Sequence, residues 1–224
     1  MSGTLVYVMG PSGAGKDSLM AYARRSMNTA YALTWNTLAG ARQHLRPVLF
    51  ARRYITRPAD AAGERHYPLT PEQFQRRQDQ GGFSLSWDSH GCRYGIGAEI
   101  DTSLAQQAVV VLNGSRQYLP AAMKKYPQLL PVLVSARPEA LRHRLEKRGR
   151  ETSADIDERL AGACMNMPDI VGLIRLDNSG ALETSGKIFA ELLTCLRRAR
   201  APETDSRAVI HPWRPKHDAP ALAF

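Results

Sequence analysis

The chain has 224 residues, of which 43% are hydrophobic and 23% charged. This length suits one domain with a substantial core, and the composition is typical of a soluble globular protein. No stretch approaches the roughly 18 apolar residues of a membrane-spanning helix, and the first residues lack the basic and then apolar pattern of a secretion signal. We therefore expect a cytoplasmic protein with no membrane association.

The formal net charge of +9 indicates a substrate or partner rich in phosphate. The charge alone fits RNA about as well as a polyanionic small molecule. The basic residues, however, lack the interleaved aromatic residues of a surface that stacks nucleic-acid bases, so we expect no nucleic-acid partner. The cysteines, Cys92, Cys164 and Cys195, form no Cys-x-x-Cys pair, which argues against a disulfide framework and against a zinc site.

The first predicted elements are a buried strand over residues 3–9 and a helix over 16–27. Between them, Gly10 and Gly15 stand five residues apart and directly before Lys16, which is the spacing of a phosphate-binding loop. Glycine permits the backbone dihedrals with which such a loop turns its N–H groups toward a phosphate. The helix N-terminus adds its dipole. The sequence therefore predicts an ATP-type nucleotide site made of Gly10, Pro11, Ser12, Gly13, Ala14, Gly15, Lys16, Asp17 and Ser18.

Asp17 occupies the position at which such loops usually carry a Ser or Thr whose hydroxyl binds Mg²⁺. A carboxylate is a hard oxygen ligand that suits Mg²⁺ directly or through water. Asp17 is therefore the expected metal ligand, and Ser18 is the alternative. Lys16 is expected to act in catalysis by binding the β- and γ-phosphates.

The chain from about 28 to 51 is expected to be an irregular or helical insertion, with a second strand near 48–54. A loop is predicted over 57–68. The next helix has a clear start, because Thr70, Pro71 and Gln73 form the pattern of an N-cap, a first-turn proline and a capping box. It is expected to end near Gln80, before two glycines.

The rest of the chain alternates apolar runs with helical patterns, which predicts an α/β fold with a parallel sheet. Two short strands at 83–87 and 93–96 are expected to form a hairpin above that sheet. Further strands are expected at 108–112, 129–134 and 173–176, helices at 138–148, 153–165 and 180–199, and a mobile tail at 200–224.

Two further groups of residues suit phosphate chemistry. Thr56 and Arg57 follow a predicted strand and offer a hydroxyl and a planar charged fork to a second phosphate. Arg148 and Arg159 flank a charged turn between two helices, where they are expected to close over the triphosphate and neutralise the transferring phosphoryl group. Either group alone is also what an ordinary solvated surface contains.

In their order along the chain, these groups resemble the guanylate kinase family. The resemblance rests on residues 10–16, 56–58, 91–95, 144–151 and 158–160, and it covers roughly 3–198. It implies a P-loop core with a parallel sheet flanked by helices, and transfer of the γ-phosphoryl group of Mg-ATP to a phosphate acceptor. The implied organisation is a kinase domain over 1–199, with an insertion at about 28–51, an acceptor-binding β subdomain at about 56–97 and a helical lid at about 146–160.

The residues with which guanylate kinases recognise guanine are absent. In our alignment Leu85 stands at the position of an acidic residue of guanylate kinases, and Ile96 at the position of a residue with a hydroxyl group. A second acidic residue of that family aligns near Asn113. An arginine of the family's pattern is replaced by Asp60. A site built to hydrogen-bond a base loses about 10⁴-fold or more in selectivity when its partners are missing, so GMP is not the expected acceptor.

The departures resemble a sister family, the ribose 1,5-bisphosphate phosphokinases, in residues 16–18, 53–57, 85–87, 94–101 and 112–116. This resemblance implies that ATP phosphorylates the 1-phosphate of α-D-ribose 1,5-bisphosphate, giving 5-phosphoribosyl 1-diphosphate and ADP in phosphonate breakdown. It also implies that arginines replace the lost guanine readers and that Asn113 and Ser115 hold ribose hydroxyls. The expected acceptor-binding residues are Arg53, Thr56, Arg57, Arg93, Tyr94, Asn113, Ser115 and Arg116.

Other functions remain open at this point. A nucleoside monophosphate kinase of altered specificity is the first alternative. A non-catalytic binding module with this fold is a second, although such modules usually have a degraded P-loop and this loop is complete. An RNA-binding P-loop protein rests on charge alone. The oligomeric state is open, and a homodimer is one possibility.

Overall fold

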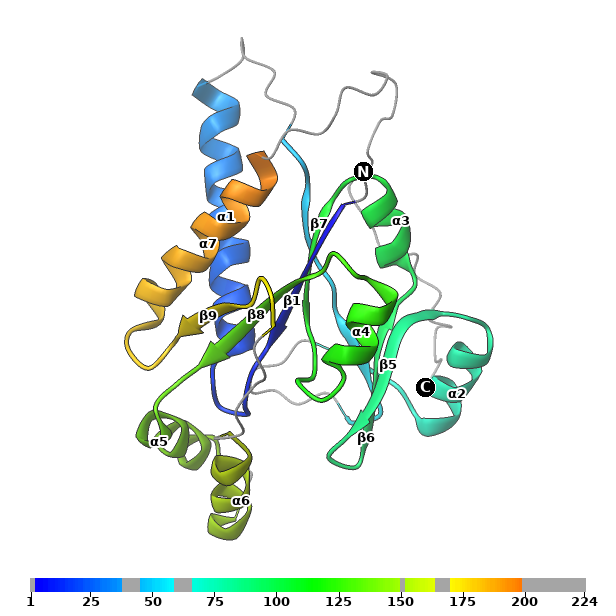
Figure 1. Cartoon of the computed structure of the whole chain (residues 1–224), viewed down its shortest axis with the longest axis vertical. Coiled ribbons are helices and arrows are strands. Elements are labelled where there is room, and N and C mark those ends of the chain that lie inside the picture. The colour runs from blue at the N-terminus through cyan, green and yellow to red at the C-terminus, as the bar shows by residue number, and fades with distance from the viewer. Residues whose placement is uncertain (1–2, 38–44, 59–65, 150–151, 164–169, 199–224) are drawn as a thin grey trace, which may run out of the picture.

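The computed structural model describes residues 3–37, 45–58, 66–149, 152–163 and 170–198. Its centre is a five-stranded, fully parallel sheet in the order β2-β7-β1-β8-β9 (Figure 1). Apolar runs form these strands because both faces of the sheet are covered. The strands are β1 (Thr4–Met9), β2 (Val48–Phe50), β7 (Val109–Asn113), β8 (Leu130–Ser135) and β9 (Ile174–Asp177).

Helices cover both faces of this parallel sheet. The helices α1 (Lys16–Thr37) and α7 (Leu182–Arg198) lie side by side on one face (Figure 1), where they bury the even-numbered residues of β1. On the other face, α3 (Glu99–Ala105) and α4 (Leu119–Lys125) share a core with Leu5, Tyr7 and Met9. The alternation along β1 therefore supplies two separate cores, one on each face.

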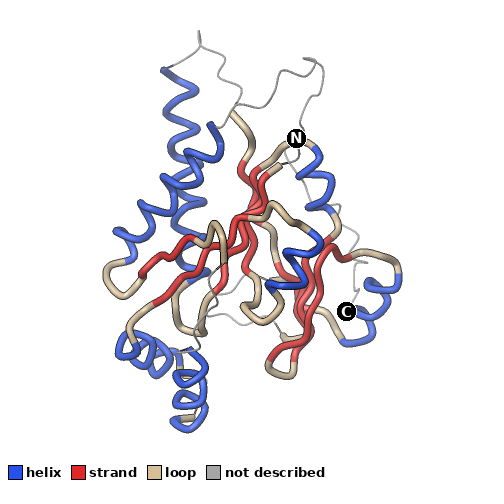
Figure 2. The backbone as a smooth tube through the Cα atoms, viewed as in Figure 1, coloured by secondary structure: helices blue, strands red, loops and turns tan. Residues whose placement is uncertain are grey.

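A second, four-stranded sheet has the order β4-β3-β6-β5 and lies beside α4 (Figure 2). It is built around the expected hairpin, whose turn at His90 and Gly91 has φ values of 49° and 69°. Two successive residues with positive φ suit the tight turns that join antiparallel strands. The elements of this small sheet are β3 (Arg53–Ile55), β4 (Tyr67–Pro68), β5 (Phe83–Ser89) and β6 (Cys92–Gly97), with α2 (Pro71–Asp79) against its outer face.

Two helices stand beyond the carboxyl ends of the main strands, on the opposite side from the small sheet (Figure 1). They are α5 (Pro138–Arg148) and α6 (Ser153–Ala163). Gly149 ends α5 with φ 64°, the left-handed conformation that glycine adopts at a helix C-terminus without steric cost. Arg142 and Asp157 join the two helices through an exposed ion pair of 2.6 Å.

Several predicted elements are confirmed, and the capping box of α2 is present with both of its hydrogen bonds. Three expectations are wrong. The loop predicted over 57–68 ends in the short strand β4, which pairs with β3. The helix after the P-loop continues through Thr37 rather than ending near 27. The single strand expected near 48–54 is two strands in different sheets, because the chain leaves the main sheet after Phe50 and enters the small sheet at Arg53.

The other differences concern what the sequence pattern did not indicate. The short helices α3 and α4 were not predicted, since seven residues carry too little periodicity to stand out. The expected tail at 200–224 and part of the insertion, residues 38–44, lie outside the described residues. Across the described ranges, no helix combines the length and apolar character needed to cross a bilayer.

Candidate active site

The predicted phosphate-binding loop connects β1 to α1 at the carboxyl edge of the main sheet. Gly10 has φ 151°, and a Cβ atom there would lie 2.1 Å from the carbonyl oxygen of Val134, so no other residue fits without moving β8. The Lys16 Nζ donates to the carbonyl oxygens of Gly10 and Pro11 at 2.9 and 2.8 Å. The ammonium group is thus held over the loop and beside the N-terminus of α1, where negative charge is favoured.

A buried asparagine, Asn178, supports the loop from the end of β9. Its Nδ2 donates to the carbonyl oxygen of Ala14 at 2.7 Å, and its Oδ1 accepts from the hydroxyl of Ser185 at 2.6 Å. The Arg144 guanidinium donates to the Asn178 backbone carbonyl at 2.8 Å. The conformation of the P-loop is therefore fixed by β9, α7 and α5 together.

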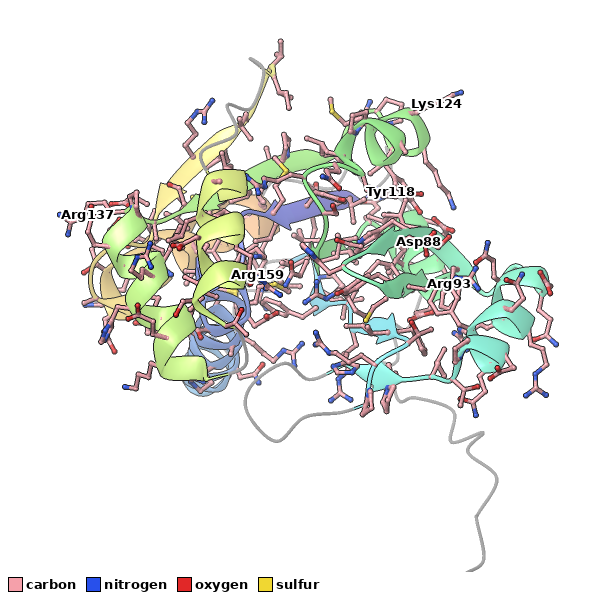
Figure 3. The ribbon with its side chains drawn as sticks, turned by 90° about the horizontal axis from the view of Figure 1, so that it is seen from below. Asp88, Arg93, Tyr118, Lys124, Arg137 and Arg159 are labelled. Atoms are coloured by element: carbon pink, nitrogen blue, oxygen red, sulfur yellow. The ribbon has the colours of Figure 1, made fainter. Side chains whose placement is uncertain are left out.

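The helix α6 brings an arginine to the loop. Arg159 Nη1 donates to the Ser12 hydroxyl at 2.9 Å, and Figure 3 labels Arg159 on α6. Arg148 is the last residue of α5, but its side chain lies outside the described part of the structure. Of the two expected lid arginines, Arg159 is the one that the described residues place at the P-loop.

Three predicted site residues from separate segments meet at Asp17. The Asn113 Nδ2, at the end of β7, donates to Asp17 Oδ1 at 2.8 Å. The Arg53 Nη2, on β3, lies 3.8 Å from the same oxygen. This contact joins the first turn of α1, the main sheet and the small sheet at one point.

Asn113 is 3% exposed, and its Oδ1 has no hydrogen-bond partner among the described residues. The orientation of the amide is set by Asp17, because a carboxylate accepts and therefore requires the NH₂ end. A buried acceptor without a partner is costly. Its position at the end of a central strand of an α/β sheet is where ligands usually bind.

Ser115 follows β7 and is held by a buried tyrosine. The Tyr7 hydroxyl donates to the Ser115 carbonyl oxygen at 2.9 Å and accepts from the Ser115 N–H at 3.0 Å. Burial raises the pKa of Tyr7 above its usual value, so this hydroxyl stays protonated and serves both bonds. Burial also lowers the pKa of the neighbouring Arg116 guanidinium from its usual value.

The predicted residues of the small sheet divide between its two faces. Tyr94 faces the main sheet, with the Arg53 guanidinium 5.6 Å from its ring centre. Thr56 accepts a hydrogen bond from the backbone N–H of Arg93 at 2.8 Å. The Arg57 carbonyl oxygen lies 3.0 Å from the His66 ring. Thr56 and Arg57 thus directly follow β3, as predicted, and these contacts are with β6 and with His66.

Arg93 does not point toward these residues. Its guanidinium donates to Gln75 and Gln78 of α2 at 2.8 and 2.7 Å and lies 4.6 Å from the ring centre of Phe74. Figure 3 shows it with Asp88 on the α2 side of the hairpin. Successive residues of a strand face opposite sides of a sheet, so Arg93 and Tyr94 cannot both reach the acceptor.

The expected metal ligands differ in their suitability. Both contacts of Asp17 are made through Oδ1, and its side chain is 44% exposed, which leaves a carboxylate oxygen for a metal ion or its water. Ser18 is exposed on the outside of α1. The described residues contain no cluster of three or more Asp, Glu, His or Cys that would hold a metal alone. This donor set fits Mg²⁺ held mainly by substrate phosphates.

Several residues that build the site were not predicted from the sequence. Asn178 was not predicted although it lies two residues beyond the strand expected at 173–176, and a polar residue at the carboxyl end of a parallel strand is itself a signal. Tyr7 was assigned only to the core, because no local pattern shows that its hydroxyl holds a loop 108 residues away. Trp87 and Tyr118 also lie at the site, stacked on each other with ring centres 5.4 Å apart.

Comparisons with known proteins show the fold and the family of this chain. No family model matches the chain. Among solved structures, a guanylate kinase from Anaplasma phagocytophilum has a TM-score of 0.58 at 14% identity, over 88% of this chain and 87% of that one, which shows the fold. Three curated proteins named ribose 1,5-bisphosphate phosphokinase PhnN are closer in sequence.

The relative from Desulfomicrobium baculatum is 49% identical over 84% of this chain and 93% of its own length. The relative from Burkholderia pseudomallei is 47% identical over 87% of this chain and 97% of its own length. The relative from Thiobacillus denitrificans is 46% identical over 86% of this chain and 93% of its own length. Identity of this extent over nearly whole chains shows common membership. The chain belongs to the ribose 1,5-bisphosphate phosphokinase family of phosphotransferases.

Proposed function

We propose that this enzyme transfers the γ-phosphoryl group of ATP to the 1-phosphate of α-D-ribose 1,5-bisphosphate, forming 5-phospho-α-D-ribose 1-diphosphate and ADP during phosphonate degradation. The observation that carries the proposal is the contact between Asp17 and Asn113. These two residues are departures from the guanylate kinase pattern, and they form one hydrogen-bonded pair between the nucleotide loop and the acceptor side. Membership of the family supports the same acceptor.

The nucleotide side has the groups needed to hold a triphosphate. Lys16 lies over the loop and binds the β- and γ-phosphates, while Arg159 approaches from α6 and neutralises charge on the transferring group. Arg148, at the end of α5, is proposed to share that role. Asp17 would hold Mg²⁺ at this site, and the ion would supply charge neutralisation to the phosphate groups.

The acceptor needs no general base. A phosphate monoester loses its second proton near pH 6, so an oxygen of the 1-phosphate is already anionic at neutral pH. This oxygen attacks the γ-phosphorus, the new P–O bond forms, and the bond from the γ-phosphorus to the bridging oxygen breaks as ADP leaves. Catalysis then consists of positioning and charge neutralisation.

The acceptor side supplies positive charge and one hydrogen-bond acceptor. Arg53 is proposed to bind the acceptor next to Asp17, with Thr56, Arg57 and Arg116 at its phosphates. The buried Asn113 Oδ1 can only accept a hydrogen bond, and ionised phosphates have no proton to donate. We therefore assign it to a ribose hydroxyl, with Ser115 and Tyr94 beside the sugar. Arg93 is left out because α2 holds its guanidinium.

The proposal is tested by a panel of acceptors with γ-labelled ATP. Ribose 1,5-bisphosphate is expected to be labelled, whereas GMP, AMP and ribose 5-phosphate are expected to remain unlabelled. Labelling of GMP with ribose 1,5-bisphosphate unreacted would identify a nucleoside monophosphate kinase instead. Arg57→Ala separates the two sides of the site, because it should raise KM for the acceptor far more than KM for ATP.

A further inference from the structure

We define the inner face of the small sheet as Arg53, Ile55, Leu85, Trp87, Tyr94 and Ile96. All of these residues except Arg53 belong to one hydrophobic core. Leu85 and Ile96 are 2% and 0% exposed and belong to the same buried cluster as Tyr7 and Leu112 of the main sheet. Guanylate kinases carry an acid and a hydroxyl at the positions of Leu85 and Ile96. Here those positions hold the two sheets together and offer a ligand no hydrogen bond.

Aromatic rings fill the rest of this inner face. The Trp87 and Tyr94 ring planes differ by 5°, with ring centres 5.6 Å apart. Tyr118, from the segment between β7 and α4, stacks on Trp87 at 5.4 Å and 26°, and Figure 3 shows Tyr118 above the small sheet. We call Tyr94, Trp87 and Tyr118 the aromatic stack.

Within the small sheet, the rings of Tyr94 and Trp87 each have a partner on both sides. In the strand order β3-β6-β5, Tyr94 has Trp87 on one side and the Arg53 guanidinium on the other. Trp87 has Tyr94 and Tyr118 as its stacking partners, and its side chain is buried. A nucleobase held by a protein needs either hydrogen-bonding groups at its edge or an aromatic face. Leu85 and Ile96 offer no hydrogen bond, and the rings of Tyr94 and Trp87 are already covered.

We infer that Trp87 is a specificity-determining residue that, with Tyr118, occupies the space a nucleobase would need and thereby restricts the acceptor to sugar phosphates without a base. The inference rests on the proposed function, because it concerns the acceptor side of that same site. The loss of the guanine-binding residues removes attraction for the base. The aromatic rings in addition fill the space that a base would occupy. Even a base that needs no hydrogen bonds is rejected, because Tyr94 is already covered.

Removal of the indole tests the inference. In Trp87→Ala, Tyr94 gains an uncovered face, and stacking of a base on an aromatic ring strengthens binding by roughly tenfold or more. The measurement is competitive inhibition of ribose 1,5-bisphosphate phosphorylation, at saturating ATP, by GMP, AMP and ribose 5-phosphate. The wild-type enzyme is expected to bind both nucleotides no more tightly than ribose 5-phosphate.

In Trp87→Ala, GMP and AMP are each expected to bind about tenfold more tightly relative to ribose 5-phosphate. The gain should be equal for the two bases, since Leu85 and Ile96 cannot distinguish them. Trp87→Phe, which keeps a ring on Tyr94, should retain the wild-type ratio. An unchanged ratio in a folded Trp87→Ala enzyme would overturn the inference.

Two more variants keep the test decisive. Tyr118→Ala removes the outer ring from a loop and should shift the ratio in the same direction, so it replaces Trp87→Ala if that protein does not fold. Tyr54→Ala is the matched control, because Tyr54 is also stacked, on Tyr67 at 4.9 Å, but lies on the outer face of the same sheet. A shift in Tyr54→Ala equal to that in Trp87→Ala would show general loosening and overturn the inference.

The result is distinguishable from failure of the proposed function. If wild-type enzyme does not phosphorylate ribose 1,5-bisphosphate, the proposed function is wrong. If it does, and the nucleotide ratio stays constant across the variants, then only the role of the aromatic stack is wrong.

Discussion

At the scale of single residues, Asp17 and Asn113 explain each other. Asn113 donates a hydrogen bond to Asp17 over 2.8 Å. An aspartate at position 113 would place a second carboxylate at about the same distance. Two carboxylates that close cannot both ionise without strong repulsion. The asparagine at the end of β7 is therefore the physical counterpart of the unusual aspartate in the P-loop, and neither departure from the guanylate kinase pattern is independent of the other.

This coupling predicts the behaviour of Asn113→Asp. Repulsion between the two carboxylates raises the pKa of the pair in the folded state, so the folded protein binds more protons than the unfolded chain. The free energy of unfolding of this variant should consequently fall, relative to wild type, as the pH rises from about 4 to 7. Urea denaturation across that range measures it.

The exchanged pair, Asp17→Asn with Asn113→Asp, is the control for this prediction. It restores one donor and one carboxylate, so its stability should return to within about 1 kcal/mol of wild type. Activity should stay low, since the carboxylate has left the P-loop. Equal stability losses in the single and exchanged variants would show that the two side chains do not interact.

A second prediction at this scale concerns Asn178. Asn178→Ala leaves the Ala14 carbonyl and the Ser185 hydroxyl without their buried partner, which should lower the free energy of unfolding by about 1–3 kcal/mol. KM for ATP should rise because the loop loses its support. Ser185→Ala is the matched control, as it removes one bond of Asn178 but keeps the one to the loop. A rise in KM for ATP of the same size in both variants would contradict this role.

At the scale of elements, α5 and α6 carry two arginines with different contacts. Arg142 of α5 makes an exposed ion pair with Asp157 of α6, whereas Arg159 of α6 reaches the P-loop. Arg159→Ala should lower kcat by roughly 10²-fold or more, since it removes charge neutralisation from the transferring phosphoryl group. Arg142→Ala should change kcat by no more than about twofold, because surface pairs contribute little. Steady-state kinetics of both variants decide this, and equal losses would reduce Arg159 to a packing role.

Elements with a local signature could be predicted from the sequence. The helix α2 begins at the expected residue because Thr70 and Gln73 satisfy each other's backbone groups within one turn. The separation of β2 from β3 could not be predicted, since only distant partners decide which sheet a strand joins. The direction of the Arg93 side chain could not be predicted either. It depends on which face of the hairpin packs against the core, and the sequence pattern leaves that open.

At the scale of the whole molecule, the two sheets share one core on the side of α3 and α4. The alternation of strands and helices predicted the α/β fold, and the phosphate site follows from the spacing of two glycines and a lysine. The contacts of the proposed acceptor side could be predicted only in part. This side combines residues of α1, β3 and β7. These elements lie far apart in the sequence, and no spacing of residues indicates that they meet at Asp17.

The net charge of +9 gives a prediction at this scale. Raising the ionic strength from about 0.01 to 0.1 M shortens the Debye length from roughly 30 to 10 Å. If the positive charge attracts the bisphosphate, this change should raise KM for ribose 1,5-bisphosphate. The turnover number should change little, because the bound state is unaltered. Initial-rate measurements test this, and a KM independent of salt would show that long-range attraction plays no part.

The central claim concerns the atom that receives the phosphoryl group, and ³¹P NMR of the product tests it most directly. With ribose 1,5-bisphosphate and ATP, we expect the signal of the 1-phosphate to be replaced by the two coupled signals of a diphosphate at carbon 1, while the 5-phosphate stays a monoester. A diphosphate at carbon 5, or an unchanged sugar bisphosphate beside phosphorylated GMP, would contradict the account.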